Sequence, residues 1–206
     1  MKMHNFSPVD GLLRDNTVLS AGMVISPIII CGNNLQNAVA LIYAFSIITL
    51  FSVVLASFVP QKLPYAAKII AYAIISSAIF IPVKILTEQI YPQCSESIGI
   101  YFPLLAVNSL IVYQTEVRFF KMRKLKMISS LVFYILGFDF VILLVGFIRE
   151  LLAYGTIYNH VVNMDSIISG IGAPFGGFIL LGLLCGIFRK LRTIASSGND
   201  SDSEVK

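Results

Sequence analysis

The sequence predicts an all-α membrane protein with six transmembrane helices, arranged as two inverted three-helix repeats in which helices 1 and 4 are broken. Composition is the first reason, because 57% of the 206 residues are hydrophobic and only 13% are charged, unlike a soluble globular domain. The second reason is that residues 16–61 contain no Lys, Arg, Asp, Glu or His. That length accommodates two spans of ~20 residues and a turn.

The six predicted spans follow one another with short polar connections. Within 16–61, the polar segment 31–37 separates the first span from the second. Lipid offers the backbone no hydrogen-bond partners, so each span is expected to be a helix rather than a strand. Four further apolar stretches, each about the ~17–25 residues that a bilayer crossing needs, complete the set: 64–86, 98–115, 128–152 and 167–188.

The distribution of basic residues predicts the orientation of the chain. Of its 15 Lys and Arg residues, all except Lys84 and Arg149 lie in the N-terminal segment, in or beside the connections after spans 2 and 4, or at the C-terminal end. Basic residues are enriched in the cytoplasmic loops of membrane proteins. We therefore expect a multi-pass protein of the bacterial inner (plasma) membrane with both termini in the cytoplasm.

Three segments are predicted along the chain. Residues 1–15 form a cytoplasmic N-terminal segment without the features of a cleaved leader, and residues 16–193 form the six-helix membrane domain. Residues 194–206 are polar and acidic, with too few apolar groups to pack, so we expect a disordered cytoplasmic tail. The net charge of +4 reflects membrane topology, and nothing else favours binding to nucleic acid.

The first helix of each half is predicted to be broken. Ser26-Pro27 and Gly32 interrupt the first span, and Pro103 with Asn108-Ser109 interrupts the fourth. Proline and small polar residues at membrane depth break the helical hydrogen-bond ladder. Interrupted segments at matching positions of two halves indicate a site near the bilayer midplane, and an odd number of spans per half makes the halves inverted.

Several of these residues occur in an order and spacing that resemble the paired six-helix membrane subunits of the Rnf and sodium-pumping Nqr redox complexes, with the RnfE/NqrD branch the nearest pattern. The resemblance covers roughly residues 16–184. It rests on NTVL at 16–19, Ser-Pro at 26–27, IGIYFPL at 98–104 with Asn108, Glu116, GFIRELL at 146–152 with Gly-Thr at 155–156, Gly-Ala-Pro at 172–174 and GFILLGLL at 177–184.

The resemblance implies a shared cofactor whose ligands this chain lacks. In the family, two pseudo-symmetric subunits hold a [2Fe-2S] cluster through one cysteine from each broken helix, and those positions correspond to Ser26 and Ser109. A neutral hydroxyl is a poor iron-sulfur ligand beside a thiolate. We therefore expect no cofactor of its own and no metal ligands, and Tyr113-Gln114 also departs from the family pattern.

The cysteines that remain do not restore the missing ligands. Cys31 lies five residues from Ser26, which displaces it by about 7.5 Å along a helix, while Cys94 falls in the connection after span 3 and Cys185 near the end of span 6. No metal-binding spacing such as C-x-x-C occurs. Buried free cysteines acting as small apolar residues are the simpler interpretation.

Charged residues within or beside the spans are further candidates. Asp139 lies near the centre of the fifth span, where a carboxylate costs ~2.5–3.5 kcal/mol to insert. It serves either as a proton or sodium relay or as one helix-helix hydrogen bond to a serine or tyrosine. Arg149-Glu150 is expected to anchor structure rather than to pair with a partner subunit, and Glu116 to pair with the basic run at 118–126.

Three functional hypotheses remain open. The first is an integral membrane subunit of an Rnf/Nqr-type ion-translocating electron transport complex, which pairs with a homologous six-helix subunit of opposite topology and with other redox subunits. The second is a small-solute transporter whose cavity between the broken helices is lined by Ser26, Asn108, Ser109 and Gln114. The third is an assembly or regulatory protein. No nucleotide, zinc or nucleophile motif is found, so the chain is at most a non-catalytic subunit of an enzyme.

Overall fold

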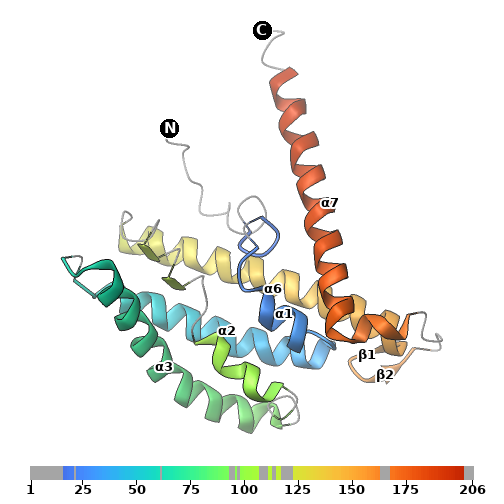
Figure 1. Cartoon of the computed structure of the whole chain (residues 1–206), viewed down its shortest axis with the longest axis horizontal. Coiled ribbons are helices and arrows are strands. Elements are labelled where there is room, and N and C mark those ends of the chain that lie inside the picture. Colours follow the sequence, from blue (N-terminus) through green and yellow to red (C-terminus); the bar gives the residue numbers. More distant parts are fainter. Residues whose placement is uncertain are drawn as a thin grey trace.

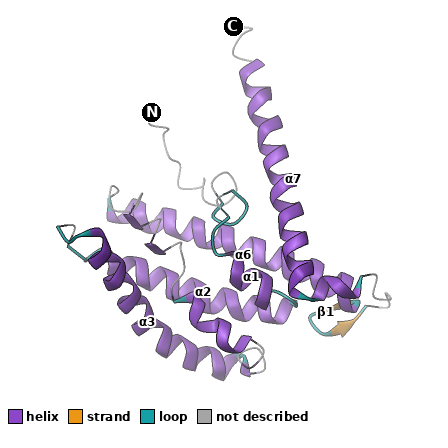
Figure 2. Cartoon of the chain, viewed as in Figure 1, coloured by secondary structure: helices purple, strands orange, loops and turns teal. Residues whose placement is uncertain are grey.

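The computed structural model is built almost entirely from helices (Figures 1 and 2). It describes residues 16–20, 22–60, 62–92, 96, 98–106, 111–112, 115–116, 123–162 and 168–201. The elements in this part of the chain are α1 (Ile25–Cys31), α2 (Leu35–Ala56), α3 (Tyr65–Ile90), the 3₁₀ helix η2 (Gly99–Leu105), α6 (Lys124–Tyr154), β1 (Thr156–Ile157), β2 (His160–Val161), the 3₁₀ helix η4 (Ser169–Gly172) and α7 (Pro174–Ser201).

Four helices in the described part of the chain are long and apolar enough to cross a membrane. They are α2, α3, α6 and the Pro174–Ile194 portion of α7. This confirms an all-α membrane protein, and the predicted spans at 64–86 and 128–152 correspond to α3 and α6, which are each a few residues longer. The finer prediction, six spans in two inverted repeats, stays a prediction, because the described residues contain four such helices.

Short helices occupy the places where the sequence predicts broken spans. α1 has only seven residues, and it begins after Val24, whose φ of 58° is left-handed. In the predicted fourth span, η2 also has seven residues and contains Pro103. Proline removes a backbone donor and clashes with the preceding turn, which fits a short 3₁₀ segment rather than a long α-helix.

The sixth predicted span begins later than the hydropathy of 167–188 indicates. η4 comes first, and α7 starts at Pro174, where proline is favoured because its missing N–H has no partner in the first turn of a helix. A β-hairpin formed by β1 and β2 precedes η4. Its two turn residues, Tyr158 and Asn159, have φ of 53° and 62°. Left-handed conformations at both positions are typical of a type I′ turn.

The packed core lies along α2, which contacts α3 on one side and α6 on the other (Figure 1). The rings of Phe45 and Phe138 stack with centroids 3.8 Å apart. Gly146 lets α6 approach α2 closely, since a Cβ there would lie 3.0 Å from the Ala38 Cβ and 3.2 Å from the Asn34 oxygen. Small residues at crossings are the common way in which membrane helices gain van der Waals contact.

α7 runs steeply across the other helices, and its C-terminal half extends away from them (Figure 1). Its beginning packs on η4 and α1, whereas Phe178, Leu183 and Leu191 are each more than half exposed. The helix continues to Ser201, which lies within the segment 194–206. The disorder expected for that tail stays a prediction, as do the other boundaries of the three segments.

Candidate functional site at the helix break

A break of three residues, Gly32 to Asn34, separates α1 from α2. The side chain of Asn34 caps α2 by accepting a hydrogen bond of 2.7 Å from the Asn37 backbone N–H, as asparagine does at helix N-termini. At the end of α1, the Gly32 N–H bonds to the Ile28 oxygen. Two helix ends of opposite dipole sign therefore meet within a few residues.

Arg149 of α6 binds the negative side of this break. Its side chain is fully buried, and Nη1 donates to the backbone oxygens of Ile29 at 2.7 Å and Gly32 at 2.8 Å. The remaining donors reach the segment before α7, with Nε 3.0 Å from the Ile171 oxygen and Nη2 2.8 Å from the Gly172 oxygen. A guanidinium presents five donors in a rigid fork, so one side chain joins α1, α6 and η4.

Glu150, the next residue, binds the positive side of the break. Its Oε2 accepts from the Leu35 N–H at 2.7 Å, at the start of α2. Its Oε1 accepts from the Asn159 N–H at 2.8 Å and from the Thr156 hydroxyl at 3.1 Å. The positive Arg149 therefore binds the negative C-terminal end of α1, and the negative Glu150 binds the positive N-terminal end of α2. These contacts agree with the anchoring role expected from the sequence.

Asp139 lies on the same helix, where α6 faces α2. It is half-buried, and the Ser46 hydroxyl donates to its Oδ2 at 3.2 Å, with Oδ1 at 3.5 Å. Sequence reasoning left the partner open as a serine or a tyrosine. A serine in the middle of the apolar α2 was the available signal, because polar groups in a membrane helix usually have a partner.

A buried asparagine ties the start of the described chain to α6 beside Asp139. Asn16 Nδ2 donates to the Gly137 oxygen at 2.8 Å, and its Oδ1 accepts from the Val18 and Leu19 N–H groups. Sequence reasoning noted Asn16 only as part of the family pattern. Its position at the edge of the apolar stretch gave no indication of a contact with residue 137.

A second polar cluster joins α3 to Glu116. Glu116 pairs with Lys68, whose Nζ lies 2.5 Å from Oε2, and with the Tyr72 hydroxyl. Residues 118–122 of the basic run at 118–126 lie outside the described part of the chain, so the expected pairing with that run stays a prediction. Burial alone would raise the pKa of Glu116, but the hydrogen bonds from Lys68 and Tyr72 and the charge of Lys68 hold the pKa below its usual value. One turn further along α3, the Ser76 hydroxyl donates to the Ala106 oxygen.

The predicted cluster and cavity positions fall mostly outside the described residues. Ser26 is exposed near the start of α1, whereas Cys31 at the other end of that helix is buried. Asn108, Ser109 and Gln114 lie outside the described part of the chain. Within that part, no group of three or more His, Cys, Asp or Glu side chains is arranged to hold a metal ion.

Long apolar helices, a broken helix and a buried arginine that ties its ends together define a polytopic membrane protein. Comparison with known proteins then identifies its family. The sequence model described as "Rnf-Nqr subunit, membrane protein" matches residues 7–191, so the chain belongs to the Rnf-Nqr subunit family. This confirms the resemblance found in the sequence.

Individual relatives cover most of the chain at modest identity. One belongs to the ion-translocating oxidoreductase complex of Haemophilus ducreyi and is 24% identical over 87% of this chain and 86% of the relative. Another, from the complex of the same name in Shewanella loihica, is 26% identical over 90% of this chain and 87% of the relative. A third belongs to the Na(+)-translocating ferredoxin:NAD(+) oxidoreductase complex of Acetobacterium woodii, with 24% identity over 86% of this chain and 91% of the relative.

Proposed function

We propose that this chain is an integral membrane subunit of an Rnf/Nqr-type ion-translocating electron transport complex. The observation that carries the proposal is the family match over residues 7–191, supported by relatives that are subunits of such complexes. Its partners are other subunits of the complex, among them a homologous six-helix subunit of opposite topology. Neither these relatives nor the described residues favour the solute-transporter alternative.

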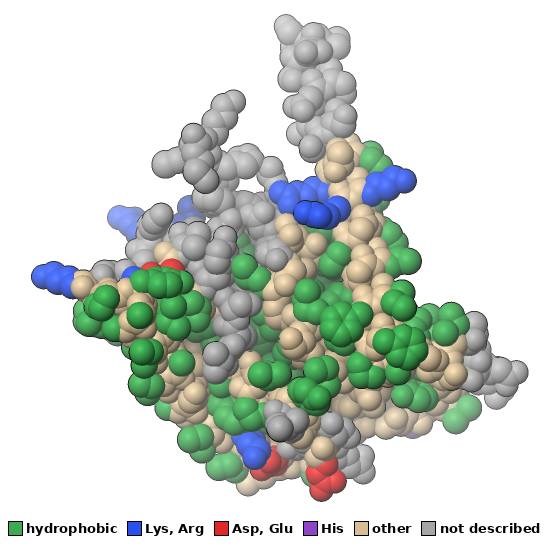
Figure 3. Space-filling view, in the orientation of Figure 1, with side chains coloured by type: hydrophobic (Ala, Val, Ile, Leu, Met, Phe, Trp, Pro, Cys, Tyr) green, Lys and Arg blue, Asp and Glu red, His purple; other side chains and the backbone are tan. Residues whose placement is uncertain are grey.

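The architecture proposed for this role has six spans in two inverted repeats, in the bacterial inner membrane, with both termini in the cytoplasm. The short α1 and η2 support two broken spans in addition to the four long helices. In the view of Figure 3, most of the visible Lys and Arg side chains lie on the upper side of the molecule, whereas acidic groups are prominent at its lower edge. This agrees with the basic residues facing the cytoplasm.

The chain acts without cluster ligands of its own in this proposal. Ser26, on the described broken helix, offers a hydroxyl, which suits iron-sulfur ligation poorly beside a thiolate. Cys31 is buried at the opposite end of α1. The donors on this helix do not fit a [2Fe-2S] cluster, so any cluster at the interface would depend on thiolates of the partner.

The role proposed for this subunit is scaffolding together with part of an ion path at Asp139. A carboxylate in a spanning helix binds a proton or a sodium ion more readily when it is reached from a polar neighbour than from lipid. Ser46 provides that neighbour on α2. The contact also fits the simpler alternative of one helix-helix hydrogen bond, and replacement of the carboxylate separates the two.

The experiment for the complex is affinity purification of the tagged chain from native membranes in mild detergent. Mass spectrometry identifies the chains that are recovered with it, and iron is assayed in the same sample. Recovery with a second six-helix protein and with flavin or iron-sulfur subunits is the expected result. Recovery of the chain by itself, free of iron and stabilised by a solute, would contradict the proposal and favour a transporter.

A further inference from the structure

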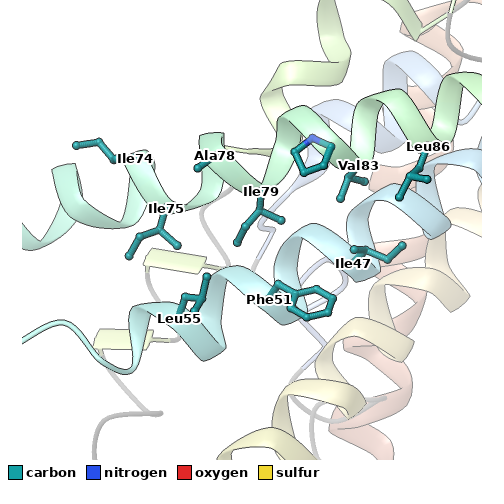
Figure 4. Close-up of a pocket in the computed structure, with 10 residues that line it drawn as sticks. Ile47, Phe51, Leu55, Ile74, Ile75, Ala78, Ile79, Val83 and Leu86 are labelled. Carbon is teal, nitrogen blue, oxygen red and sulfur yellow. The ribbon is translucent and has the colours of Figure 1, made fainter.

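An apolar groove runs along the outer side of the α2–α3 pair (Figure 4). Ile47, Phe51 and Leu55 form its α2 wall, and its α3 wall includes Ile75 and Ile79. The side chains of Ile75 and Ile79 point toward α2 across the gap, whereas Ile74, at the same end of the groove, points away from α2. Its volume is about 550 Å³, within the ~300–1,000 Å³ typical of small-ligand sites. We refer to it as the α2–α3 groove.

The dimensions of the α2–α3 groove suit one extended hydrocarbon chain. From Ile47 to Leu55, α2 advances by about 12 Å, close to the ~15 Å of hydrocarbon that one leaflet contributes to a bilayer. An α-helix with its side chains is ~10–12 Å wide, so a helix of another subunit would cover the groove rather than fill it. The groove is also open, since Phe51 is 53% and Ile74 is 65% exposed.

Basic residues gather where the groove ends beyond Leu55. One turn after Leu55, the ring of Phe58 lies under the Lys124 ammonium, 4.1 Å from Nζ to the ring centroid. Lys62 follows in the same connection and is exposed, as are Arg123 and Lys126 at the start of α6. An apolar groove that ends at exposed cations is complementary to a lipid with an anionic headgroup.

We propose that the α2–α3 groove binds one acyl chain of an anionic phospholipid, whose headgroup phosphate is held by Lys62 and Lys124. The site is distinct from the helix break and from the polar contacts of Asp139. A lipid bound here would stabilise the α2–α3 pair and link it to the start of α6 through Lys124. This inference does not depend on the redox role of the complex.

Tryptophan fluorescence gives a direct test, because the chain contains no tryptophan. The full-length Phe51→Trp variant is reconstituted in vesicles that contain brominated phosphatidylglycerol or brominated phosphatidylcholine at equal mole fraction. Bromine quenches a tryptophan in contact with the acyl chain. We expect stronger quenching by the anionic lipid, with a preference of at least about fivefold in relative binding constant, the effect of one nearby lysine.

Matched controls define the result that would overturn the proposal. Phe178→Trp on α7 reports ordinary lipid contact and is expected to show no preference. Lys62→Gln with Lys124→Gln should lower the preference at Phe51→Trp several-fold, whereas Lys190→Gln on α7 should leave it unchanged. The proposal is refuted if both lipids quench Phe51→Trp equally, or if the preference does not change when the two lysines are replaced. It is also refuted if neither lipid quenches Phe51→Trp, which is the result expected when protein covers the groove.

Discussion

Arg149 is enclosed by protein, and its five hydrogen bonds all end on backbone oxygens. The oxygens belong to two segments far apart in sequence, the end of α1 and the stretch before α7. No other side chain type supplies five donors in one plane. The position therefore requires arginine for its shape as well as for its charge.

Replacing Arg149 with lysine should destabilise the protein by roughly 3–5 kcal/mol, because an ammonium cannot reach both segments and buried carbonyls lose their donors. The measurement is the thermal midpoint in detergent, followed with a thiol-reactive dye in a Cys94→Ser, Cys185→Ser background, so that the signal reports the exposure of the buried Cys31. Lys84→Arg on the exposed side of α3 is the control and should change little. An unchanged midpoint for Arg149→Lys would exclude the anchoring role.

The Asp139→Asn variant distinguishes the two roles open for Asp139, an ion relay and a hydrogen bond between helices. The amide keeps a hydrogen bond with Ser46 and removes the titratable group, so stability should change by less than about 1 kcal/mol while ion translocation by the reconstituted complex is lost. Transport is measured in proteoliposomes beside the thermal midpoint. Ser46→Ala keeps the titratable group but removes its polar neighbour, so it should cost about 0.5–1.5 kcal/mol and lower transport less than Asp139→Asn does. Full transport in Asp139→Asn would leave only the structural role.

At the scale of elements, the crossing of α2 and α6 depends on Gly146. Valine there would bring side-chain atoms against Ala38 and the Asn34 backbone, and overpacking of this kind costs about 1–3 kcal/mol. The thermal midpoint of Gly146→Val should fall accordingly. Gly182→Val on α7 is the control, since a Cβ at Gly182 meets nothing within 4 Å; equal losses in both variants would count against a close crossing.

The contact between α3 and Glu116 should make stability depend on acid pH. The pKa of Glu116 is lowered in the folded protein, so its contribution is present above the unfolded pKa of ~4.3 and is lost as the pH falls through the lower, folded value. Thermal midpoints across this range should fall less steeply for Glu116→Gln than for the wild type. Glu88→Gln, at an exposed pair with Lys84, should keep the wild-type slope.

For the whole molecule, the proposed topology predicts the location of each terminus and loop. Green fluorescent protein fused after Lys206 should fluoresce, because it folds in the cytoplasm, and alkaline phosphatase at the same point should be inactive. Phosphatase fused after Asn159, in the hairpin between α6 and α7, should be active. The reverse pattern would show that the distribution of basic residues had been interpreted with the wrong sign.

Part of the candidate site was accessible to sequence reasoning. Polar or charged residues in apolar surroundings pointed to Asp139, to Arg149-Glu150 and to the break at Gly32, because such residues are costly in lipid and need partners. Their partners were not accessible. Ser46 is 93 residues from Asp139 along the chain and Ile29 is 120 from Arg149, and no local pattern encodes which residue completes such a contact.

Composition and hydropathy by themselves determined that this is an all-α membrane protein and where most of its long helices lie, while Gly32 and Pro103 indicated the interruption after α1 and the short η2. These features follow from how each residue interacts with lipid or with its own backbone, so they can be derived locally. Only the tertiary structure decided that Glu116 pairs with Lys68, that Arg149 and Glu150 bind opposite sides of one break, and that α2 and α3 leave a groove between them. These depend on which helices pack together, and a uniformly apolar helix can pack through any of its faces.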